Sequence, residues 1–420
     1  MILRAAAGLL ACLAAALFVL APSPHRKVLQ LPPGVLYVQS EMVVGPDVEV
    51  RGAPSGTTLR FAPKFSGRAL IVVKGWDVAL RDFTVEGDRA VNDARSGLPP
   101  YDRPFSKFTR GNGVLAESVG HLRISGLHFR EISGFAILLS AVTDVAIDHV
   151  AVSDSGSRNP AGRNNTSGGI LLEEGTYGFQ VTGCDLRNVR GNGIWTHSLY
   201  TSPRNARGLI ARNRFTTLGR DAIQVGHATG VRVEENSGRW IGYPEDDTDI
   251  AGGAYPVAID TAGNVDRSVY AGNVFRDING KCIDLDGFHD GEIRGNTCVN
   301  LRNYGIVMNN TNPDMQSQNI RVVDNVIDGA MFGAIFVIGH DNLVARNRFV
   351  NIKADPGPPG ILSAGIYLGE RAERPGPARN NIIEDNVITG NQMATRCVLT
   401  APAIRPAWNT IRNNVCRADR

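Results

Sequence analysis

The residues best suited to chemistry lie in the segment 281–296, where acidic and aliphatic side chains alternate. Asp284 and Asp286 each follow an aliphatic residue, and His289 and Asp290 come at the next turn. Because successive residues of a β-strand point to opposite faces, both carboxyl groups would project from one face while the aliphatic groups are buried on the other. Carboxyl and imidazole groups act as general acids and bases, and carboxylates also bind hard cations. The segment therefore predicts a catalytic or cation-binding site.

A repeated pattern places this segment in a larger architecture. The pattern aliphatic-x-x-Asn-x-apolar recurs along the chain, and its closest copies begin 22 or 23 residues apart, as at positions 322 and 344 or 210 and 233. The asparagines of these copies are Asn213, Asn236, Asn273, Asn296, Asn325, Asn347, Asn386 and Asn414. A second strand pattern, small-Ile-x-apolar-x, lies between successive copies. Short strands at this spacing indicate a solenoid, in which stacked asparagine side chains can hydrogen-bond along the axis.

Alignment of the second strand pattern predicts which side chains become neighbours on the outer face of the solenoid. One predicted column contains Glu173, His197, Gly226, Asp260, Asp286 and Asn309. The adjacent column contains Trp195, Gln224, Ala258, Asp284, Val307, Phe336 and Tyr367. Parallel strands lie about 4.8 Å apart, so Glu173 is expected to contact His197. Asp260 is expected to contact Asp286, and such stacked like charges are destabilising unless a cation or a shared proton relieves the repulsion.

The repeat resembles the right-handed parallel β-helix superfamily, which includes pectate lyases, polygalacturonases and alginate C5-epimerases. The resemblance extends over residues 30–416 and implies an all-β, right-handed parallel β-helix solenoid. We expect about 10–12 coils of about 22–24 residues with inserted loops, forming a single domain over residues 28–420. The acidic loop 238–254 is expected to form the rim of a binding cleft.

Residues 1–23 contain one basic residue followed by an unbroken apolar run from Ala5 to Ala21. This pattern is typical of a signal peptide or an N-terminal anchor, so we expect export to the periplasm, the cell surface or the medium, with membrane contact only through this segment. The formal net charge of +3 does not indicate a basic patch for nucleic acid. Five scattered cysteines follow the segment, and we expect Cys298 and Cys416 to be buried hydrophobic residues rather than disulfide partners.

Three chemistries fit the acidic residues. Polygalacturonases, which the chain resembles here, hydrolyse a glycosidic bond with acids on neighbouring coils; one carboxyl group protonates the leaving oxygen and another acts as base or nucleophile. Resemblance to pectate lyases implies instead that Asp260, Asp284 and Asp286 bind Ca²⁺ while a base removes the proton next to a uronate carboxylate. The candidate bases are His289, His197 and Lys281. The segment 286–290 also resembles the Asp-Pro-His-Asp block of alginate C5-epimerases, so an epimerase is the alternative enzyme.

We expect these residues to act on a polysaccharide, with a polyuronate as one candidate, bound along the outer face of a monomeric protein. The residues assigned to catalysis are Asp260, Asp284, Asp286, His289, His197 and Glu173. The residues assigned to substrate binding are Trp195, Gln224, His227, Asn309, Asp290 and Lys281, with Phe336 and Tyr367 as further stacking positions. A non-catalytic surface or adhesion solenoid is the alternative from another class, in which the acids only solubilise this face.

Overall fold

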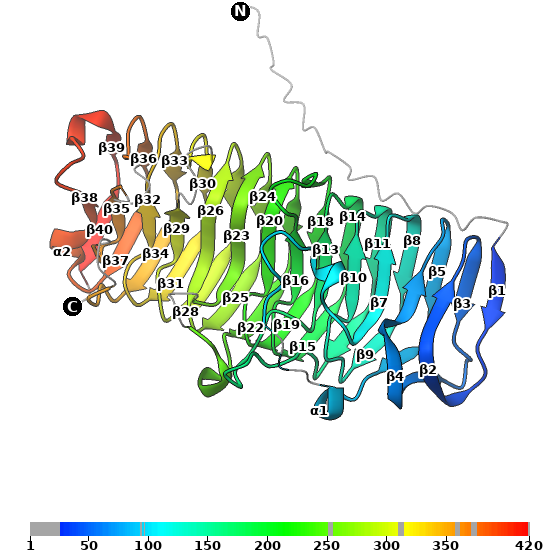
Figure 1. Ribbon diagram of the computed structural model, residues 1–420. Coiled ribbons are helices and arrows are strands. Elements are labelled where there is room, and N and C mark those ends of the chain that lie inside the picture. Colours follow the sequence, from blue (N-terminus) through cyan, green and yellow to red (C-terminus); the bar gives the residue numbers. More distant parts are fainter. Residues whose placement is uncertain are drawn as a thin grey trace, which may run out of the picture.

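The computed structural model describes residues 26–92, 95, 97–250, 255–309, 315–357, 362–370 and 376–418. The segment 1–23, in which a signal peptide or anchor is predicted, lies outside the described residues. The described chain forms one 40-stranded sheet wound into an elongated stack, which Figure 1 shows from its blue amino-terminal end to its red carboxyl-terminal end. Within this part of the chain, the structure contains no helix that is both long and apolar enough to cross a membrane.

The strands form three columns of parallel neighbours, which we call columns A, B and C. Column A comprises β2 (Gly34–Val44), β4 (Thr57–Val73), β7 (Asn112–Glu117), β10 (Ile137–Ser140), β13 (Ile170–Glu173), β16 (Ile194–His197), β20 (Ile223–Thr229), β23 (Val257–Asp266), β26 (Lys281–His289), β29 (Ile306–Asn309), β32 (Ile335–Val337), β35 (Ile366–Leu368) and β38 (Val398–Thr400). Column B comprises β1 (Lys27–Gln30), β3 (Val48–Arg51), β5 (Val78–Arg81), β8 (Gly120–Ser125), β11 (Thr143–Asp148), β14 (Tyr177–Thr182), β18 (Leu209–Ala211), β21 (Arg232–Glu234), β24 (Val269–Ala271), β27 (Glu292–Arg294), β30 (Arg321–Val323), β33 (Leu343–Ala345), β36 (Ile382–Glu384) and β39 (Thr410–Arg412).

Column C comprises β6 (Thr84–Glu86), β9 (His128–Arg130), β12 (Ala151–Ser153), β15 (Asp185–Val189), β19 (Arg214–Leu218), β22 (Ser237–Ile241), β25 (Val274–Ile278), β28 (Thr297–Leu301), β31 (Val326–Ala330), β34 (Arg348–Ile352), β37 (Val387–Gly390) and β40 (Val415–Ala418). The short strand β17 (Asn205–Ala206) pairs with β14 and β20. The helical segments are single turns: α1 (Arg89–Asn92), η1 (Phe105–Lys107), η2 (Glu245–Asp247), α2 (Met393–Arg396) and η5 (Pro406–Trp408).

The predicted asparagine column is confirmed as a buried ladder at the corner between columns B and C. Nδ2 of Asn213 donates to Oδ1 of Asn236 at 3.0 Å, and Nδ2 of Asn236 donates to Oδ1 of Asn273 at 2.9 Å. The same contact continues along the stack through Asn273, Asn296, Asn325, Asn347, Asn386 and Asn414. Each side chain also bonds main-chain groups, so the ladder satisfies buried backbone polar groups at every corner and keeps the coils in phase.

The predicted register of column A is confirmed at one pair and wrong at another. Glu173 pairs with His197 as expected. Asp260 pairs with Asp284, whereas Asp286 pairs with Ala262, so the predicted Asp260–Asp286 pairing is shifted by two residues. A shift by two keeps every side chain on the same face of a strand, so alternation alone does not determine it. All three carboxyl groups therefore still lie on one face, opposite the buried aliphatic residues of β26.

The cysteine prediction is wrong. Cys282 forms a disulfide with Cys298, and Cys397 forms one with Cys416, with Cα–Cα distances of 6.0 and 5.8 Å. Each pair joins neighbouring strands or turns of one coil, because a chain that winds once through the coil brings residues 16 or 19 positions apart face to face. Cys184 is a free, buried thiol.

Candidate functional site

Four carboxyl groups and one lysine gather on column A, and we call Asp221, Asp260, Lys281, Asp284 and Asp286 the acid cluster. Asp260 on β23 and Asp284 on β26 are direct cross-strand partners, and Asp286 follows on the same face of β26. Lys281 forms an ion pair with Asp284. Asp221 precedes β20, close enough for its charge to act on Asp260. Residues that are about 60 positions apart in the chain thus form one site, because successive coils superimpose.

A relay of amide side chains holds Asp260. Nδ2 of Asn192 donates to Oε1 of Gln224 at 2.7 Å, and Nε2 of Gln224 donates to Oδ2 of Asp260 at 2.7 Å. Gln224 is the cross-strand partner of Asp260, whereas the aligned columns placed it beside Ala258. Asn192 and Asp221 were not among the predicted site residues. Both stand just before a strand, outside the alternation from which the columns were aligned.

Burial sets the protonation states in the cluster. Burial, together with the neighbouring charges of Asp221 and Asp284, raises the pKa of Asp260 well above its usual value. Burial also raises the pKa of Asp221 to about 6, although Val257 donates its N–H to that carboxyl group at 2.8 Å. Burial alone lowers the pKa of Lys281, but the Asp284 carboxylate outweighs it and raises the pKa. The cluster therefore places Asp260, whose pKa is raised, beside an Asp284 that faces the ammonium group of Lys281.

The cluster keeps partial access to solvent. Asp260 and Asp286 are half-buried, and Asp284 is 6% exposed. Oδ1 of Asp284 is buried and has no hydrogen-bond partner among the described residues. Asn309 pairs with Asp286 across the next strand, as predicted, and its Oδ1 is likewise buried without a partner in the described part of the chain. The cluster and Asn309 thus contain two buried acceptor oxygens that no described group satisfies.

The three aspartates do not fit the predicted calcium site. Lys281 already supplies a positive charge to Asp284. Within the described residues, the group of three acidic or histidine side chains whose ligand atoms all lie within 4.8 Å of one another is Glu173, Glu174 and His197, which contains none of the three aspartates. Calcium takes six or more oxygen ligands, and an ammonium group among them opposes its charge.

His289 is not free to act as the predicted base. Its Nδ1 contacts Oδ2 of Asp290 at 2.7 Å, and its Nε2 contacts Oδ1 of Asn264 at 3.0 Å. Asp290 in turn accepts a hydrogen bond from Asn319 at 3.1 Å. Both ring nitrogens are therefore engaged at the end of β26, three residues beyond Asp286.

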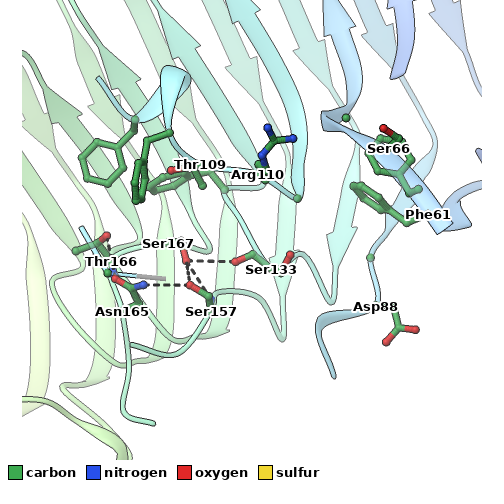
Figure 2. A pocket seen from close by; sticks show the side chains of 18 residues that line it. Phe61, Ser66, Asp88, Thr109, Arg110, Ser133, Ser157, Asn165, Thr166 and Ser167 are labelled. Carbon is green, nitrogen blue, oxygen red and sulfur yellow. Dashed lines mark hydrogen bonds between the residues drawn. The ribbon is translucent and has the colours of Figure 1, made fainter. Parts of the chain in front are cut away.

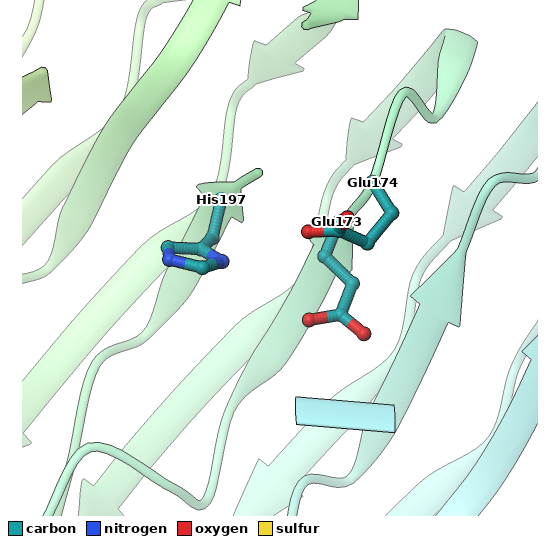
Figure 3. A group of neighbouring side chains, drawn as sticks. All are labelled: Glu173, Glu174 and His197. Atoms are coloured by element: carbon teal, nitrogen blue, oxygen red, sulfur yellow. The ribbon is translucent and has the colours of Figure 1, made fainter. Parts of the chain in front are cut away.

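Glu173 and His197 are brought together as predicted, but Glu173 is fully buried. Its two carboxyl oxygens accept the main-chain N–H groups of Phe105 and Ser106 at 2.9 and 2.8 Å. Burial raises the pKa of Glu173, against the effect of these hydrogen bonds. Figure 3 shows its side chain next to those of Glu174 and His197. Glu173 therefore anchors a loop, and the prediction that it lies exposed on the outer face is wrong.

The anchored loop is the segment 97–111, which we call the strap; in Figure 1 it is the cyan segment crossing β10, β13 and β16. Phe105 of the strap packs against Trp195 and His197, with ring centroids 4.9 and 5.5 Å apart. Burial under the strap lowers the pKa of His197 to about 4, so this imidazole is neutral at pH 7.

The predicted stacking aromatics are not exposed. Trp195, Phe336 and Tyr367 are 7%, 0% and 6% exposed. Trp195 lies beneath Phe105 of the strap, while Phe336 and Tyr367 stack on each other with centroids 5.7 Å apart. The prediction of an open aromatic groove is therefore wrong, because all three rings are buried against other side chains.

The predicted notch at Gly226, between the strap and the acid cluster, is not an open one, because Gly226 is buried. A Cβ at this position would lie 2.8 Å from the carbonyl oxygen of Thr196, so no larger residue fits. His227 beside it is 9% exposed and packs its ring against Tyr200 with centroids 4.9 Å apart. Burial lowers the pKa of His227. His227 therefore contacts other side chains rather than lining an open cleft.

The described part of the acidic loop 238–254 packs on the neighbouring loop 154–167. Asp247 forms an ion pair with Arg158, and Nδ2 of Asn159 donates to Oδ2 of Asp249 at 2.6 Å. Residues 251–254 lie outside the described residues. The acidic side chains of this loop thus hold two loops together.

Comparison with known proteins identifies the fold. A family profile described as "Right handed beta helix region" matches residues 257–418. No curated protein sequence matches the chain. Together with the parallel columns, the match confirms the predicted right-handed parallel β-helix.

Three solved structures illustrate the likeness. The GH136 lacto-N-biosidase from Eubacterium ramulus has a TM-score of 0.51 and 14% identity, over 89% of this chain and 62% of its own. A variant of the periplasmic alginate epimerase AlgG has a TM-score of 0.50 and 15% identity, over 92% and 79%. The N-terminal fragment of bacteriophage Phi29 gene product 12 has a TM-score of 0.62 and 11% identity, over 89% and 66%. The chain spans less than two thirds of the lacto-N-biosidase, and these likenesses show the fold alone.

Proposed function

We propose that the protein binds a polysaccharide along column A and hydrolyses a glycosidic bond at the acid cluster. The observation that carries this proposal is a pair of cross-strand carboxyl groups in different electrostatic surroundings. Asp260 has a raised pKa, and Asp284 beside it is ion-paired with Lys281. A neutral carboxyl group next to an ionised one is the pair that glycoside hydrolysis uses.

Asp260 is the general acid in this mechanism. Gln224 donates to its Oδ2, which leaves Oδ1 to carry the proton. Transfer of this proton to the glycosidic oxygen accompanies cleavage of the bond to the anomeric carbon, and the leaving sugar departs as an alcohol. Asp284 or Asp286 supplies the negative charge, as the base that deprotonates water or as the nucleophile at the anomeric carbon. In either case water provides the hydroxyl group of the new reducing end.

The contacts of the candidate bases favour hydrolysis over β-elimination or C5 epimerisation. Both of those reactions need a free base beside the proton at C5 of a uronate. His289 has both ring nitrogens engaged, and Lys281 is held as an ammonium ion by Asp284. His197 lies beneath Phe105 of the strap. The carboxyl pair is therefore the best-placed proton donor and acceptor on column A.

The setting proposed for this activity is outside the cytoplasm. Disulfides persist in oxidising compartments and are rare in the cytosol, so the Cys282–Cys298 and Cys397–Cys416 bonds support export. Residues 1–23 are the proposed signal peptide or anchor. The likeness to a lacto-N-biosidase and an alginate epimerase supports a carbohydrate as partner, and we propose that the protein acts on it as a monomer.

The test is an assay of the purified protein against pectate, alginate and a panel of neutral glycans, each with and without EDTA. New reducing ends are expected on at least one glycan, without absorbance at 235 nm and without loss of rate in EDTA. An unsaturated product that absorbs at 235 nm would show that the protein is a lyase and not a hydrolase. A lower rate in EDTA would show that the reaction needs a bound metal ion. Exchange of the C5 proton without chain cleavage would point to an epimerase. Glycan binding without any turnover would favour an adhesion module.

A further inference from the structure

A second cleft lies on the opposite side of the strap from the acid cluster. Its volume is about 410 Å³, within the range of small-molecule sites. We call it the hydroxyl cleft after the side chains that line it, Ser66, Thr109, Ser133, Ser157, Thr166 and Ser167. Figure 2 shows Ser133, Ser157 and Ser167 below Thr109 and Arg110, with Phe61 and Ser66 to one side. None of these residues was singled out by the sequence pattern.

The serines on one wall are held in place by hydrogen bonds. Oγ of Ser157 contacts Oγ of Ser167 at 2.9 Å, and Nδ2 of Asn165 donates to Oγ of Ser157 at 3.2 Å. Ser167 also donates to the carbonyl oxygen of Ser133 at 3.3 Å. Ser133, Ser157 and Ser167 are 7%, 6% and 4% exposed. The hydroxyl groups of Ser157 and Ser167 are therefore preorganised.

Aromatic rings complete the lining. Phe61 and Phe65 stand together, with ring centroids 4.6 Å apart, while Phe105 and Phe108 come from the strap. The charged residues that line the cleft are one basic and one acidic side chain, Arg110 and Asp88, both exposed. Aromatic faces pack against the C–H surfaces of a sugar ring while hydroxyl groups bond its hydroxyls. The balanced charge favours an uncharged sugar over a uronate.

The strap separates the hydroxyl cleft from the acid cluster. One residue, Phe105, lines the cleft and also packs against Phe135 and Trp195, with ring centroids 5.6 and 4.9 Å apart. Its backbone is fixed by the buried carboxyl group of Glu173. A ligand in the cleft thus contacts different side chains from a ligand at Asp260 and Asp284.

We propose that the hydroxyl cleft is a separate binding site for a neutral sugar unit. This site goes beyond the proposed hydrolysis, because sugar binding here needs none of the carboxyl groups of the acid cluster. Thr109 and Ser66 stand at its accessible side, and the bonded serines form its floor.

The test is saturation-transfer NMR and calorimetric titration of the full protein with D-glucose, D-galactose, D-mannose, N-acetyl-D-glucosamine and D-galacturonate. At least one neutral sugar is expected to bind, and galacturonate is expected to bind at least tenfold more weakly. Thr109→Trp is expected to weaken neutral-sugar binding at least tenfold by filling the cleft, with unchanged turnover at the acid cluster. Thr395→Trp, on exposed α2, is the matched control and should bind as the unaltered protein does.

Two further variants separate this proposal from the hydrolysis. Asp284→Asn should abolish turnover and leave neutral-sugar binding unchanged, whereas Ser133→Ala should weaken sugar binding with an unchanged melting temperature. Binding of galacturonate alone, no binding of any neutral sugar, or neutral-sugar binding that survives Thr109→Trp would overturn the site. Loss of neutral-sugar binding in Asp284→Asn would also overturn the proposal, because it would show that the sugar binds at the acid cluster.

Discussion

The acid cluster and the Glu173–His197 pair lie on the same face of column A, yet they are different kinds of site. Both consist of ionisable cross-strand neighbours. At Glu173 the strap covers the pair and supplies two N–H donors, so both oxygens of the carboxyl group bind the backbone of this loop. At Asp284 no such donors cover Oδ1 among the described residues. The two pairs lie on the same face, but Asp260 and Asp284 are in register with Trp195, two residues before His197, and only the Glu173 pair lies under the strap.

This contrast gives a physical rule for the whole outer face. A carboxyl group with its acceptors satisfied by main-chain N–H groups contributes to folding and gains nothing from a ligand. A carboxyl group forced beside another, as Asp260 is beside Asp284, is a source of protons. The two regions should therefore respond to substitution in opposite ways.

The largest expected effect is the loss of turnover in Asp260→Asn. The amide has no proton to give to the leaving oxygen, so kcat/KM is expected to fall about 10²- to 10⁴-fold, the usual contribution of a general acid. Glu173→Gln is expected to leave kcat within a few-fold and to lower the free energy of unfolding by about 1–3 kcal/mol, because one buried N–H of the strap loses its acceptor. The measurements are glycan turnover and denaturant unfolding of each variant.

Asp324→Asn is the matched control, since Asp324 is exposed and forms an ion pair with Arg346 far from the acid cluster in the sequence. It should change neither quantity by more than the error. A kcat that falls as far in Glu173→Gln as in Asp260→Asn, with the strap still folded, would contradict the division between an anchoring and a reacting carboxyl group. Trp195 fluorescence reports whether the strap remains in place, because Phe105 packs on that ring.

The sequence predicted the solenoid well because its strongest constraints are local and repeated. Each Asn of the ladder must occupy the same corner, so Asn213 and Asn296 reveal the period without any knowledge of contacts. The side of the strand was also predictable, since alternation sets it for Asp284 and Asp286. These features depend on spacing within a single coil.

The pairing register of the strands, and the loops that cover them, could not be predicted in the same way. Val257 and Ile259 both fit the aliphatic position of the strand pattern, and only pairing with the next coil selects Ile259. The strap contacts a partner 68 residues away, and nothing in its own sequence indicates which coil it crosses. Phe105 was missed for that reason, and so was the burial of Trp195.

The asparagine ladder tests whether the register beneath the acid cluster is needed for its chemistry. Asn296→Ala removes the acceptor of Asn273 and the donor to the carbonyl of Tyr270, all buried, so the free energy of unfolding is expected to fall by about 3 kcal/mol. Asn414→Ala, at the half-buried end of the ladder, should cost about 1 kcal/mol. Denaturant unfolding measures both values.

Asn296 belongs to the coil that carries Asp284, so its removal should also reduce turnover more than Asn414→Ala does. The Glu173 region lies several coils away and should keep the fluorescence of Trp195. Equal losses of stability in the two variants would show that the ladder does not depend on burial.

The last prediction concerns Asp221 and tests the effect of burial on the charges of the acid cluster. Its pKa is raised to about 6 by burial, above the ordinary value near 4 of an unfolded chain. The folded state therefore holds a proton that the unfolded state has lost. The stabilisation is complete below pH 4 and disappears as the pH rises through 6, with a size on the order of 3 kcal/mol.

In Asp221→Asn the amide still accepts the N–H of Val257 but cannot ionise, so the fall in stability between pH 4 and pH 7 should shrink by that amount. Unfolding free energies of the two proteins across this range measure it, with Asp324→Asn as the control that keeps the full fall. If stability falls as much between pH 4 and pH 7 in Asp221→Asn as in the unaltered protein, ionisation of Asp221 does not lower the free energy of unfolding. The proton assigned to Asp260 would then lose its physical basis, because the same burial and the same neighbours raise both pKa values.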